Sequence, residues 1–184
     1  FQLAQSGRPG PVLIDLPKDI SAGMGEAVFT PPVKLPKASP PDAAAMRTAS
    51  EMLSKARRPL VIAGGGIAIS DSVDDFRHFI ERTGLPVTST LKGLGIMPAH
   101  DPNFVGMLGM HGNGAANHAV QNCDLLMVVG ARFDDRATGQ LAQFAPAARI
   151  IHIDIDPAEI SKLRKADVAI ISELAPALEG IRPE

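Results

Sequence analysis

The feature that most constrains the fold of this chain is a series of short apolar runs, each followed at once by a loop of glycines or polar residues. The runs that precede such loops are residues 60–63, 86–89, 124–129 and 149–154. Four to six apolar residues bounded by turn residues are typical of a buried β-strand. A further run, at 166–171, has the pattern of an edge strand.

Helical patterns, with apolar residues three and four positions apart, separate these runs at 43–56, 72–83 and 115–122. Strands that alternate with helices predict an α/β fold: a doubly wound, Rossmann-like, mainly parallel sheet of about six strands with helices on both faces. Right-handed crossovers put the loops that follow the strands on one edge of such a sheet, where ligands bind. These loops are residues 64–66, 90, 130–136 and 154–156.

The distribution of proline and glycine predicts four segments. Residues 1–20 combine the end of a helix with a strand-like run at 11–16, which cannot bury itself alone, so we expect them to end a preceding domain. Residues 21–41 are rich in proline and read as a linker. Residues 42–172 form the α/β domain, and 173–184 begin a second linker. Because the chain starts at Phe1 without a methionine, we expect it to be a piece of a longer protein.

Composition excludes several classes of function. The 184 residues carry a net charge of −2, which favours neither nucleic acid nor an anionic membrane surface as a partner. No apolar run approaches the roughly 18 residues of a membrane-spanning helix. One cysteine forbids an internal disulfide, and with five scattered histidines it makes a cysteine-histidine metal site unexpected.

Three glycines, Gly64 to Gly66, stand between a predicted strand and a helix. Without Cβ atoms the backbone can approach an anion, and a helix N-terminus favours negative charge, so this is a candidate phosphate loop. The dinucleotide fingerprint is incomplete because Ile69 occupies the position of its third glycine. A tight strand-to-helix turn explains the same residues.

Carboxylates follow a second strand, at Asp154 and Asp156. Asp154 is the better candidate to accept hydrogen bonds from ribose or ribityl hydroxyls. Asp156 is better explained as the cap of a short helix that starts at Pro157.

Two arginines and two aspartates lie within five residues after the strand at 124–129. Arg132 and Arg136 suit planar or bidentate recognition of phosphate or carboxylate, whereas a salt-bridge network with Asp134 and Asp135 would instead fix the loop. His111 lies in a glycine-rich turn, where the pattern favours a hydrogen-bonding role over a catalytic one. From the residues alone we therefore predict a nucleotide-type ligand and no self-sufficient catalytic apparatus.

Several segments together resemble the large, catalytic subunit of the acetolactate synthase (acetohydroxyacid synthase) family. They are SGRPGPVLIDLPKDI at 6–20, TLKGLG at 90–95, MLGMHG at 107–112, CDLLMVVGARFDDRATG at 123–139 and HIDIDPAEI at 152–160. The resemblance implies that the α/β domain is the central FAD-binding domain of a thiamine-diphosphate enzyme, and that 1–20 end its pyrimidine-binding domain. The FAD contacts that it implies are Arg8, Gly64, Gly65, Gly66, Thr90, Leu91, Leu108, Gly109, Met110, His111, Gly130, Arg132, Asp134, Arg136, Asp154, Ile155, Asp167 and Val168.

The family condenses pyruvate, after decarboxylation, with pyruvate or 2-ketobutyrate in branched-chain amino acid biosynthesis. The resemblance implies that FAD takes no part in the net reaction. It places Arg136 beside the carboxylate of the second 2-ketoacid, and Met110, Asp135 and Lys18 in the substrate channel. Lys92 and Ala137 depart from the family pattern, which often has Met and Val there.

Thiamine diphosphate and Mg²⁺ are expected to bind mainly outside this segment, because the activating glutamate lies upstream of it and the metal motif downstream. The segment alone should therefore be inactive. Implied partners are the remaining domains, a homodimer or tetramer of catalytic subunits, and a small regulatory subunit. The implied location is the cytoplasm in a bacterium, the plastid in a plant and the mitochondrion in a fungus.

Two other hypotheses fit the same pattern. One is the central domain of another thiamine-diphosphate enzyme, such as pyruvate oxidase or glyoxylate carboligase. The other is a non-catalytic nucleotide-binding module.

Overall fold

The structure, a computed structural model, describes residues 1–29, 31 and 38–183, and the chain divides into two compact units, Phe1–Ala38 and Ser39–Glu184. Among its described residues, the first unit contains two single-turn helices, α1 (Gln2–Gln5) and α2 (Lys18–Ser21). The strand predicted at 11–16 is wrong: no strand forms there, and the Leu13 side chain is 93% exposed. A lone strand has no neighbour for its backbone hydrogen bonds, so this apolar run stays open.

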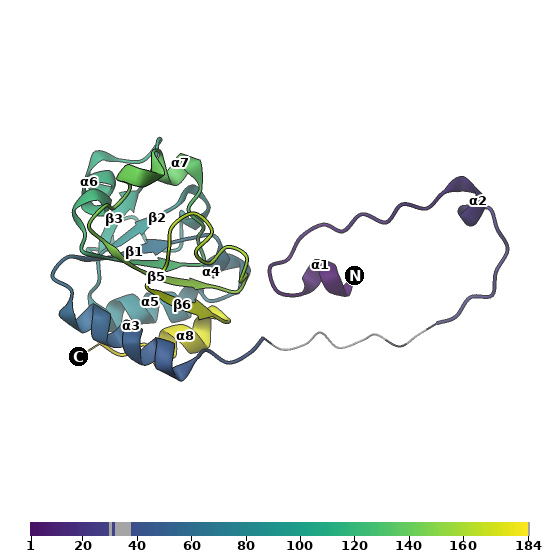
Figure 1. The fold of residues 1–184 in the computed structure, drawn as a ribbon, viewed down its shortest axis with the longest axis horizontal. Coiled ribbons are helices and arrows are strands. Elements are labelled where there is room, and N and C mark those ends of the chain that lie inside the picture. Colours follow the sequence, from purple (N-terminus) through teal and green to yellow (C-terminus); the bar gives the residue numbers. More distant parts are fainter. Residues whose placement is uncertain (30, 32–37, 184) are drawn as a thin grey trace. The chain divides into compact units, whose positions relative to one another are not determined.

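The second unit is built on one six-stranded sheet in which every pair of neighbours is parallel (Figure 1). Its strands are β1 (Pro59–Ala63), β2 (Val87–Ser89), β3 (Phe104–Met107), β4 (Leu125–Val129), β5 (Arg149–Asp154) and β6 (Val168–Ile171). They lie in the order β3-β2-β1-β4-β5-β6. This is the doubly wound order of Rossmann folds, so the predicted fold class is confirmed.

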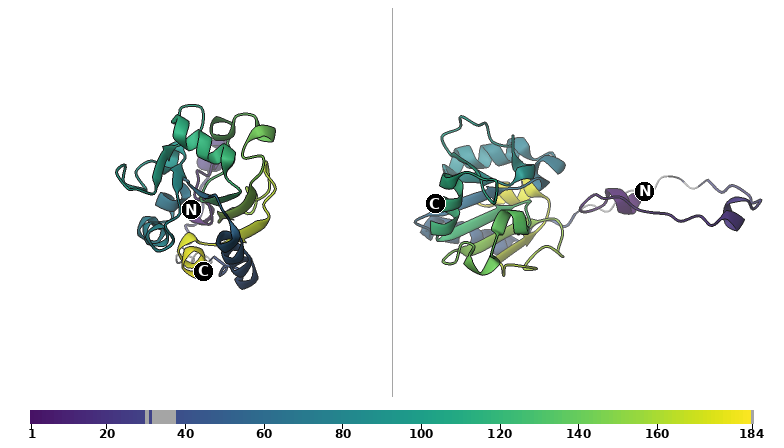
Figure 2. Two further views of the ribbon diagram at one scale, coloured as in Figure 1. Left: turned by 90° about the vertical axis from the view of Figure 1, so that its left-hand side faces the viewer. Right: turned by 90° about the horizontal axis from the view of Figure 1, so that it is seen from above.

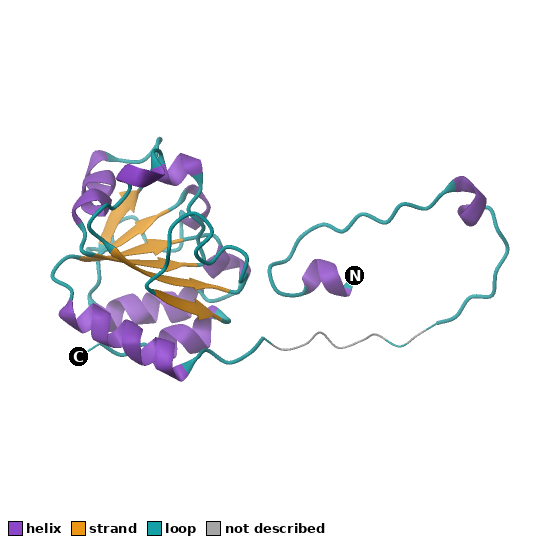
Figure 3. Ribbon diagram, viewed as in Figure 1, coloured by secondary structure: helices purple, strands orange, loops and turns teal. Residues whose placement is uncertain are grey.

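Helices cover both faces of the sheet (Figure 2 and Figure 3). The helices are α3 (Ala43–Lys55), α4 (Gly66–Ile69), α5 (Val73–Thr83), α6 (Gly114–Asn122), α7 (Asp135–Thr138) and α8 (Leu174–Gly180), with 3-10 turns η1 (Leu91–Gly93) and η2 (Leu141–Gln143). Buried side chains of α3, α5 and α8 pack on one face, and those of α6 with residues 131–148 pack on the other. Alternate strand residues supply the two cores, since successive side chains point to opposite faces.

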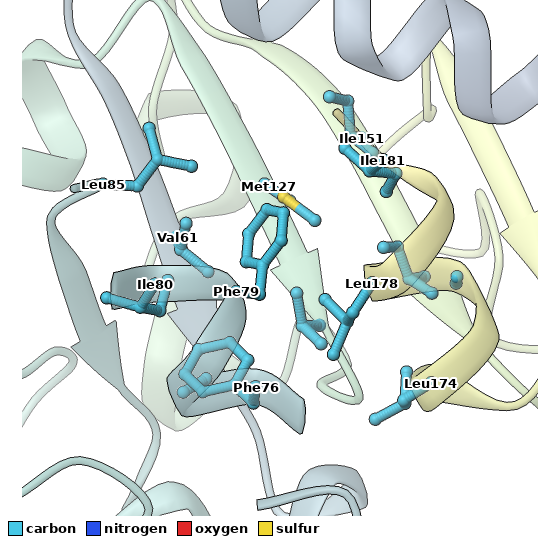
Figure 4. Close-up of a cluster of buried hydrophobic side chains, with 14 of the residues drawn as sticks. Val61, Phe76, Phe79, Ile80, Leu85, Met127, Ile151, Leu174, Leu178 and Ile181 are labelled. Atoms are coloured by element: carbon cyan, nitrogen blue, oxygen red, sulfur yellow. The ribbon is translucent and has the colours of Figure 1, made fainter. Parts of the chain in front are cut away.

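The larger core lies between the sheet and α5 and α8 (Figure 4). Phe76 and Phe79 of α5 are essentially fully buried, as is Leu178 of α8. They pack with strand residues such as Val61 and Met127 in the same cluster. Full burial of side chains this large contributes roughly 1.5–3 kcal/mol each, so this layer stabilises the fold substantially.

The ends of the helices follow local signals. Asp42 begins α3, and its side chain accepts a hydrogen bond from the backbone N–H of Ala44 at 2.9 Å. Asn113 caps α6 in the same way through Ala116 N–H at 2.7 Å. Gly84 ends α5 in the left-handed region, at φ 65°, where glycine is unstrained. Each of these helix ends therefore lies at a residue whose own chemistry favours it.

Three segments differ from the sequence prediction. Strand β3 was not predicted, because Gly106 (φ 110°) interrupts a half-buried run of only four residues. The helix predicted to start at Pro157 is a turn, in which the Asp156 carboxylate accepts the Ala158 N–H. Residues 173–184 do not begin as a linker: α8 forms there, because Leu174, Ala177 and Leu178 complete the core beside α5.

Candidate functional site

The carboxyl ends of β1 and β4 meet at the centre of the sheet, where the strand order reverses. Two loops leave there, residues 64–66 (the glycine loop) and residues 130–138 (the arginine loop). The glycine loop donates hydrogen bonds from Gly64 N to Val129 O and from Gly66 N to Gly130 O, both at 2.9 Å. Thr90, after β2, donates its N–H to Ala63 O at 3.0 Å. Loops that the sequence separates are therefore adjacent at the point where open α/β sheets bind ligands.

Close backbone packing explains the three glycines. A Cβ on Gly64 would overlap the carbonyl oxygen of Gly130, and one on Gly66 would lie 2.8 Å from Gly130 Cα. A Cβ on Gly65 would lie 2.8 Å from Lys92 Cβ. The helix that follows, α4, has only four residues. The tight-turn interpretation therefore accounts for the glycine loop without a bound phosphate.

A third loop, residues 107–112 (the methionine turn), follows β3 and contacts the arginine loop. Met110 donates its N–H to Arg136 O at 2.9 Å, and the Arg136 guanidinium lies 3.6 Å from the Met110 sulfur. Leu108 donates its N–H to Ser89 O at the end of β2. The two polar stretches that stand out in the sequence are thus one continuous surface, with Met110 and His111 exposed on it.

The charged groups of the arginine loop divide into two kinds. Arg132 forms an ion pair with Asp134 at 3.0 Å, and Asp134 caps α7 by accepting Arg136 N–H. That backbone N–H, followed by the Asp135 and Arg132 side chains, lowers the pKa of Asp134 from its ordinary value. Asp135 also accepts Arg136 N–H, at 2.9 Å. The salt-bridge interpretation is therefore confirmed for Arg132 and Asp134.

Arg136 differs from Arg132 in its partners. Within the described part of the chain, the side-chain partner of its guanidinium is the Met110 thioether, a weak acceptor. Its charge is exposed at the edge of the sheet and available to an anion.

Carboxylates also lie at the end of β5, on the same edge of the sheet. The side chain of Asp154 accepts the Asp156 N–H at 2.9 Å, and the Asp154 carbonyl accepts the Ser172 N–H at 3.3 Å. Asp154 and Ile155 are half-buried at the edge that carries the arginine loop. Asp156 caps a turn, as its proximity to Pro157 suggested, although the turn is not a helix.

The structure does not bring Asp167 and Val168 to this edge. The Asp167 carboxylate accepts Ile150 N–H at 2.8 Å and lies 3.4 Å from Arg149 Nε, at the amino ends of the strands. Val168, the first residue of β6, is buried in the core. Their predicted placement among the ligand contacts is therefore corrected: Asp167 precedes β6 and Val168 begins it, whereas the loops of the candidate site follow the ends of strands.

Glu173 also lies at this edge and was not among the residues predicted from the sequence. It follows β6, is exposed, and adjoins Ser172, which is bonded to Asp154. The signal was present, because a polar residue directly after an edge strand obeys the rule that selected the other loops. Two further predicted contacts, Arg8 and Lys18, lie in the first unit, and their part in the site stays a prediction.

A buried histidine contacts the arginine loop from the adjacent strand β5. His152 of β5 is fully buried, its Nε2 lies 2.8 Å from Ala131 O, and its ring meets Phe133 edge-on with centroids 5.5 Å apart. Its Nδ1 has no partner among the described residues. Burial lowers the pKa of His152, because the charged imidazolium would lose its hydration.

His152 predicts a specific pH dependence of stability. Unfolding returns its pKa to about 6.5, so below that pH the unfolded chain binds a proton that the folded chain does not. Stability should therefore fall with acidification below pH 6.5, by at most about 1.4 kcal/mol per pH unit from this group. Urea unfolding at pH 7.5 and 5.5 should show a smaller loss for His152→Gln than for the unsubstituted chain. The exposed His78 provides the control His78→Gln; an unchanged pH dependence in His152→Gln would contradict the assignment.

The residues that the structure describes contain no group of three or more His, Cys, Asp or Glu side chains placed to hold a metal ion. None of their helices is long and apolar enough to cross a membrane. A shallow depression lined by Lys55, Asp124 and Arg149 lies at the amino edge of the sheet, away from the polar loops.

Comparison with known proteins adds independent information. The family described as "Thiamine pyrophosphate enzyme, central domain" matches residues 46–181. The chain is 51% identical, over 97% of its length, to the acetolactate synthase isozyme 2 large subunit of Escherichia coli strain K12, of which it covers 33%. It is 46% identical, over 98% of its length, to the chloroplastic acetolactate synthase 1 of Zea mays, of which it covers 29%. The chain thus spans about a third of the length of these relatives.

Proposed function

Because the chain belongs to the family of thiamine pyrophosphate enzyme central domains, we propose that it is the central domain of an acetolactate synthase catalytic subunit and binds FAD at the carboxyl edge of its sheet. The observation that supports this most is the meeting of the glycine loop, the methionine turn and the arginine loop at the switch point of the sheet. Both relatives compared above carry the name acetolactate synthase, which favours this enzyme over a pyruvate oxidase, a glyoxylate carboligase or a non-catalytic module.

The groups at this edge fit the chemistry of FAD. The Arg132 guanidinium, oriented by Asp134, suits the pyrophosphate. Asp154, and Glu173 beside it, suit hydroxyl groups, since carboxylates accept their hydrogen bonds. Leu91 and Met110, 71% and 63% exposed, offer apolar surface to a flat ring system. Bound there, FAD would supply an isoalloxazine ring and, as the family resemblance implies, no net redox chemistry.

The residues that face the substrate form the second part of the proposal. Arg136 carries a positive charge with no carboxylate in ion-pair distance among the described residues, and would hold the carboxylate of the second 2-ketoacid. Met110 lies against that guanidinium and would limit the space beside it. Thiamine diphosphate, Mg²⁺, the partner subunits and the condensation of pyruvate with a 2-ketoacid belong to the longer protein in this proposal.

The test is FAD binding by the purified chain, followed by flavin absorbance and by titration of flavin fluorescence. We expect Arg132→Gln to raise the dissociation constant for FAD about tenfold, since a hydrogen bond to a charged group contributes roughly 1.5 kcal/mol. Arg47→Gln, an exposed arginine on α3, is the matched control and should leave the constant unchanged. A chain that binds no FAD, or an Arg132→Gln variant that binds it equally well, would contradict the proposed site.

A further inference from the structure

Asn117, on α6, holds the backbone of a single residue in the methionine turn. Its Oδ1 accepts the Gly109 N–H at 2.8 Å, and its Nδ2 donates to Gly109 O at 3.0 Å. One side-chain amide thus satisfies both polar groups of one residue, and the pairing of donor with acceptor defines the orientation of the amide. The Asn117 side chain is half-buried, so these bonds are partly shielded from water.

Gly109 is the point where the methionine turn touches the arginine loop. Its φ of 98° lies in a region that only glycine adopts without strain. A Cβ at this position would lie 2.5 Å from Arg136 O, so the two backbones are in direct contact. The next residue, Met110, donates its N–H to the same Arg136 carbonyl. The methionine turn is therefore bonded to Asn117 through Gly109, and to Arg136 through Met110.

We propose that Asn117 is a positioning residue that fixes the methionine turn against the arginine loop, and thereby sets the places of Met110 and Arg136 at the ligand edge. No other side chain from α6 has this geometry, among the described residues: Asn113 caps the helix and bonds Val105 O, and Asn122 bonds His118 O. The consequence for ligand binding rests on the proposed function, whereas the coupling of the two loops does not.

Substitution of Asn117 by leucine removes both hydrogen bonds with little change of volume. The Gly109 N–H would then lack a partner, and Gly109 O would retain the Gly112 N–H at 3.0 Å, so the turn should open to hydrate the freed N–H. Asn122→Leu makes the same change on the same helix at an exposed position and is the matched control. Asn117→Asp retains the acceptor for Gly109 N–H but loses the donor to Gly109 O.

Amide hydrogen exchange of the 184-residue chain tests the coupling directly. We expect the Gly109 and Met110 amides to exchange at least tenfold faster in Asn117→Leu, with the amides of β4 unchanged. The Met110 amide is decisive, because its partner is Arg136 rather than Asn117. An unchanged Met110 amide beside a faster Gly109 amide would overturn the proposal, as would the same acceleration in Asn122→Leu.

Asn117→Asp provides a reading that a general loss of stability would not reproduce. At pH 7 its carboxylate faces the Gly109 carbonyl without a proton to donate, so the Met110 amide should again exchange faster than in the unsubstituted chain. At pH 4 partial protonation restores a donor, and the difference should shrink. A difference that is equal or larger at pH 4 would contradict the bidentate role, and this variant also decides the matter if Asn117→Leu does not fold.

Titration with FAD then separates this proposal from the proposed function. We expect Asn117→Leu to raise the dissociation constant for FAD about tenfold, equivalent to about 1.4 kcal/mol, and Asn122→Leu to leave it unchanged. An unsubstituted chain that binds no FAD would contradict the proposed function, while the exchange measurements would still decide whether Asn117 couples the loops.

Discussion

Replacement of Gly64 by alanine is expected to lower the free energy of unfolding by about 3 kcal/mol, an effect at the upper end of the range for overpacking. The added methyl group would overlap Gly130 O and the Cβ atom of Ala131. Gly130 and Ala131 directly follow β4, which is the neighbour of β1 in the sheet. Neither loop can retreat, because Gly64 N–H is bonded to Val129 O in the centre of the sheet. Chemical denaturation followed by circular dichroism measures the change.

Gly114→Ala is the matched control for this substitution. Gly114 is the first residue of α6, and a Cβ there meets no atom within 4 Å. Alanine favours helices over glycine, so this variant should be as stable as the unsubstituted chain or slightly more stable. If Gly64→Ala proved equally well tolerated, the close packing of the glycine loop would be refuted, and a ligand-binding reason for the glycines would gain weight.

Leu178→Ala is expected to cost about 3 kcal/mol of stability, within the range for leucine deletions in packed cores. Leu178 is 1% exposed and belongs to the cluster that α8 forms with α5 and the sheet. The same variant tests whether residues 173–184 form part of the domain or a linker. Truncation of a side chain in a linker would change the free energy of unfolding very little.

Leu163→Ala deletes the same atoms from a side chain that is 54% exposed, and should cost less than about 1 kcal/mol. Both variants can be compared by urea unfolding at one pH. Similar midpoints for the two would show that α8 is not part of the cooperative unit, whatever its helical conformation.

The α/β architecture could be predicted because its signals are local. Apolar runs at β1, β4 and β5 are long enough to identify buried parallel strands, and Asp42 and Gly84 mark the ends of helices by their own chemistry. The rule that loops after strands share one edge then selected the arginine loop and Asp154 correctly. The same rule applied to β6 selects Glu173, whereas Asp167 and Val168 came from the family resemblance.

The remaining errors have a common cause. Strand β3 and helix α8 carry weak patterns of their own and form because neighbouring elements complete their hydrogen bonds and their burial. The run at 11–16 carries a strong strand pattern, yet it forms no strand, and the described residues of the first unit offer it no partner strand. Local propensity alone therefore does not determine whether a segment forms a strand or helix. Tertiary contacts can induce an element in a weak pattern, and their absence can leave a strong pattern without one.

By itself, the sequence determined the class of fold, the edge of the sheet that carries the polar loops and the residue types present there. Only the tertiary structure decided how those loops meet. The reason for Gly64 and Gly66 is Gly130 with its neighbour Ala131, and the reason for Gly65 is Lys92. The place of Arg136 depends on Met110 and, in our proposal, on Asn117. Such contacts join residues far apart in the chain, and their energies depend on distances of a few tenths of an ångström that no spacing of residues along the sequence can express.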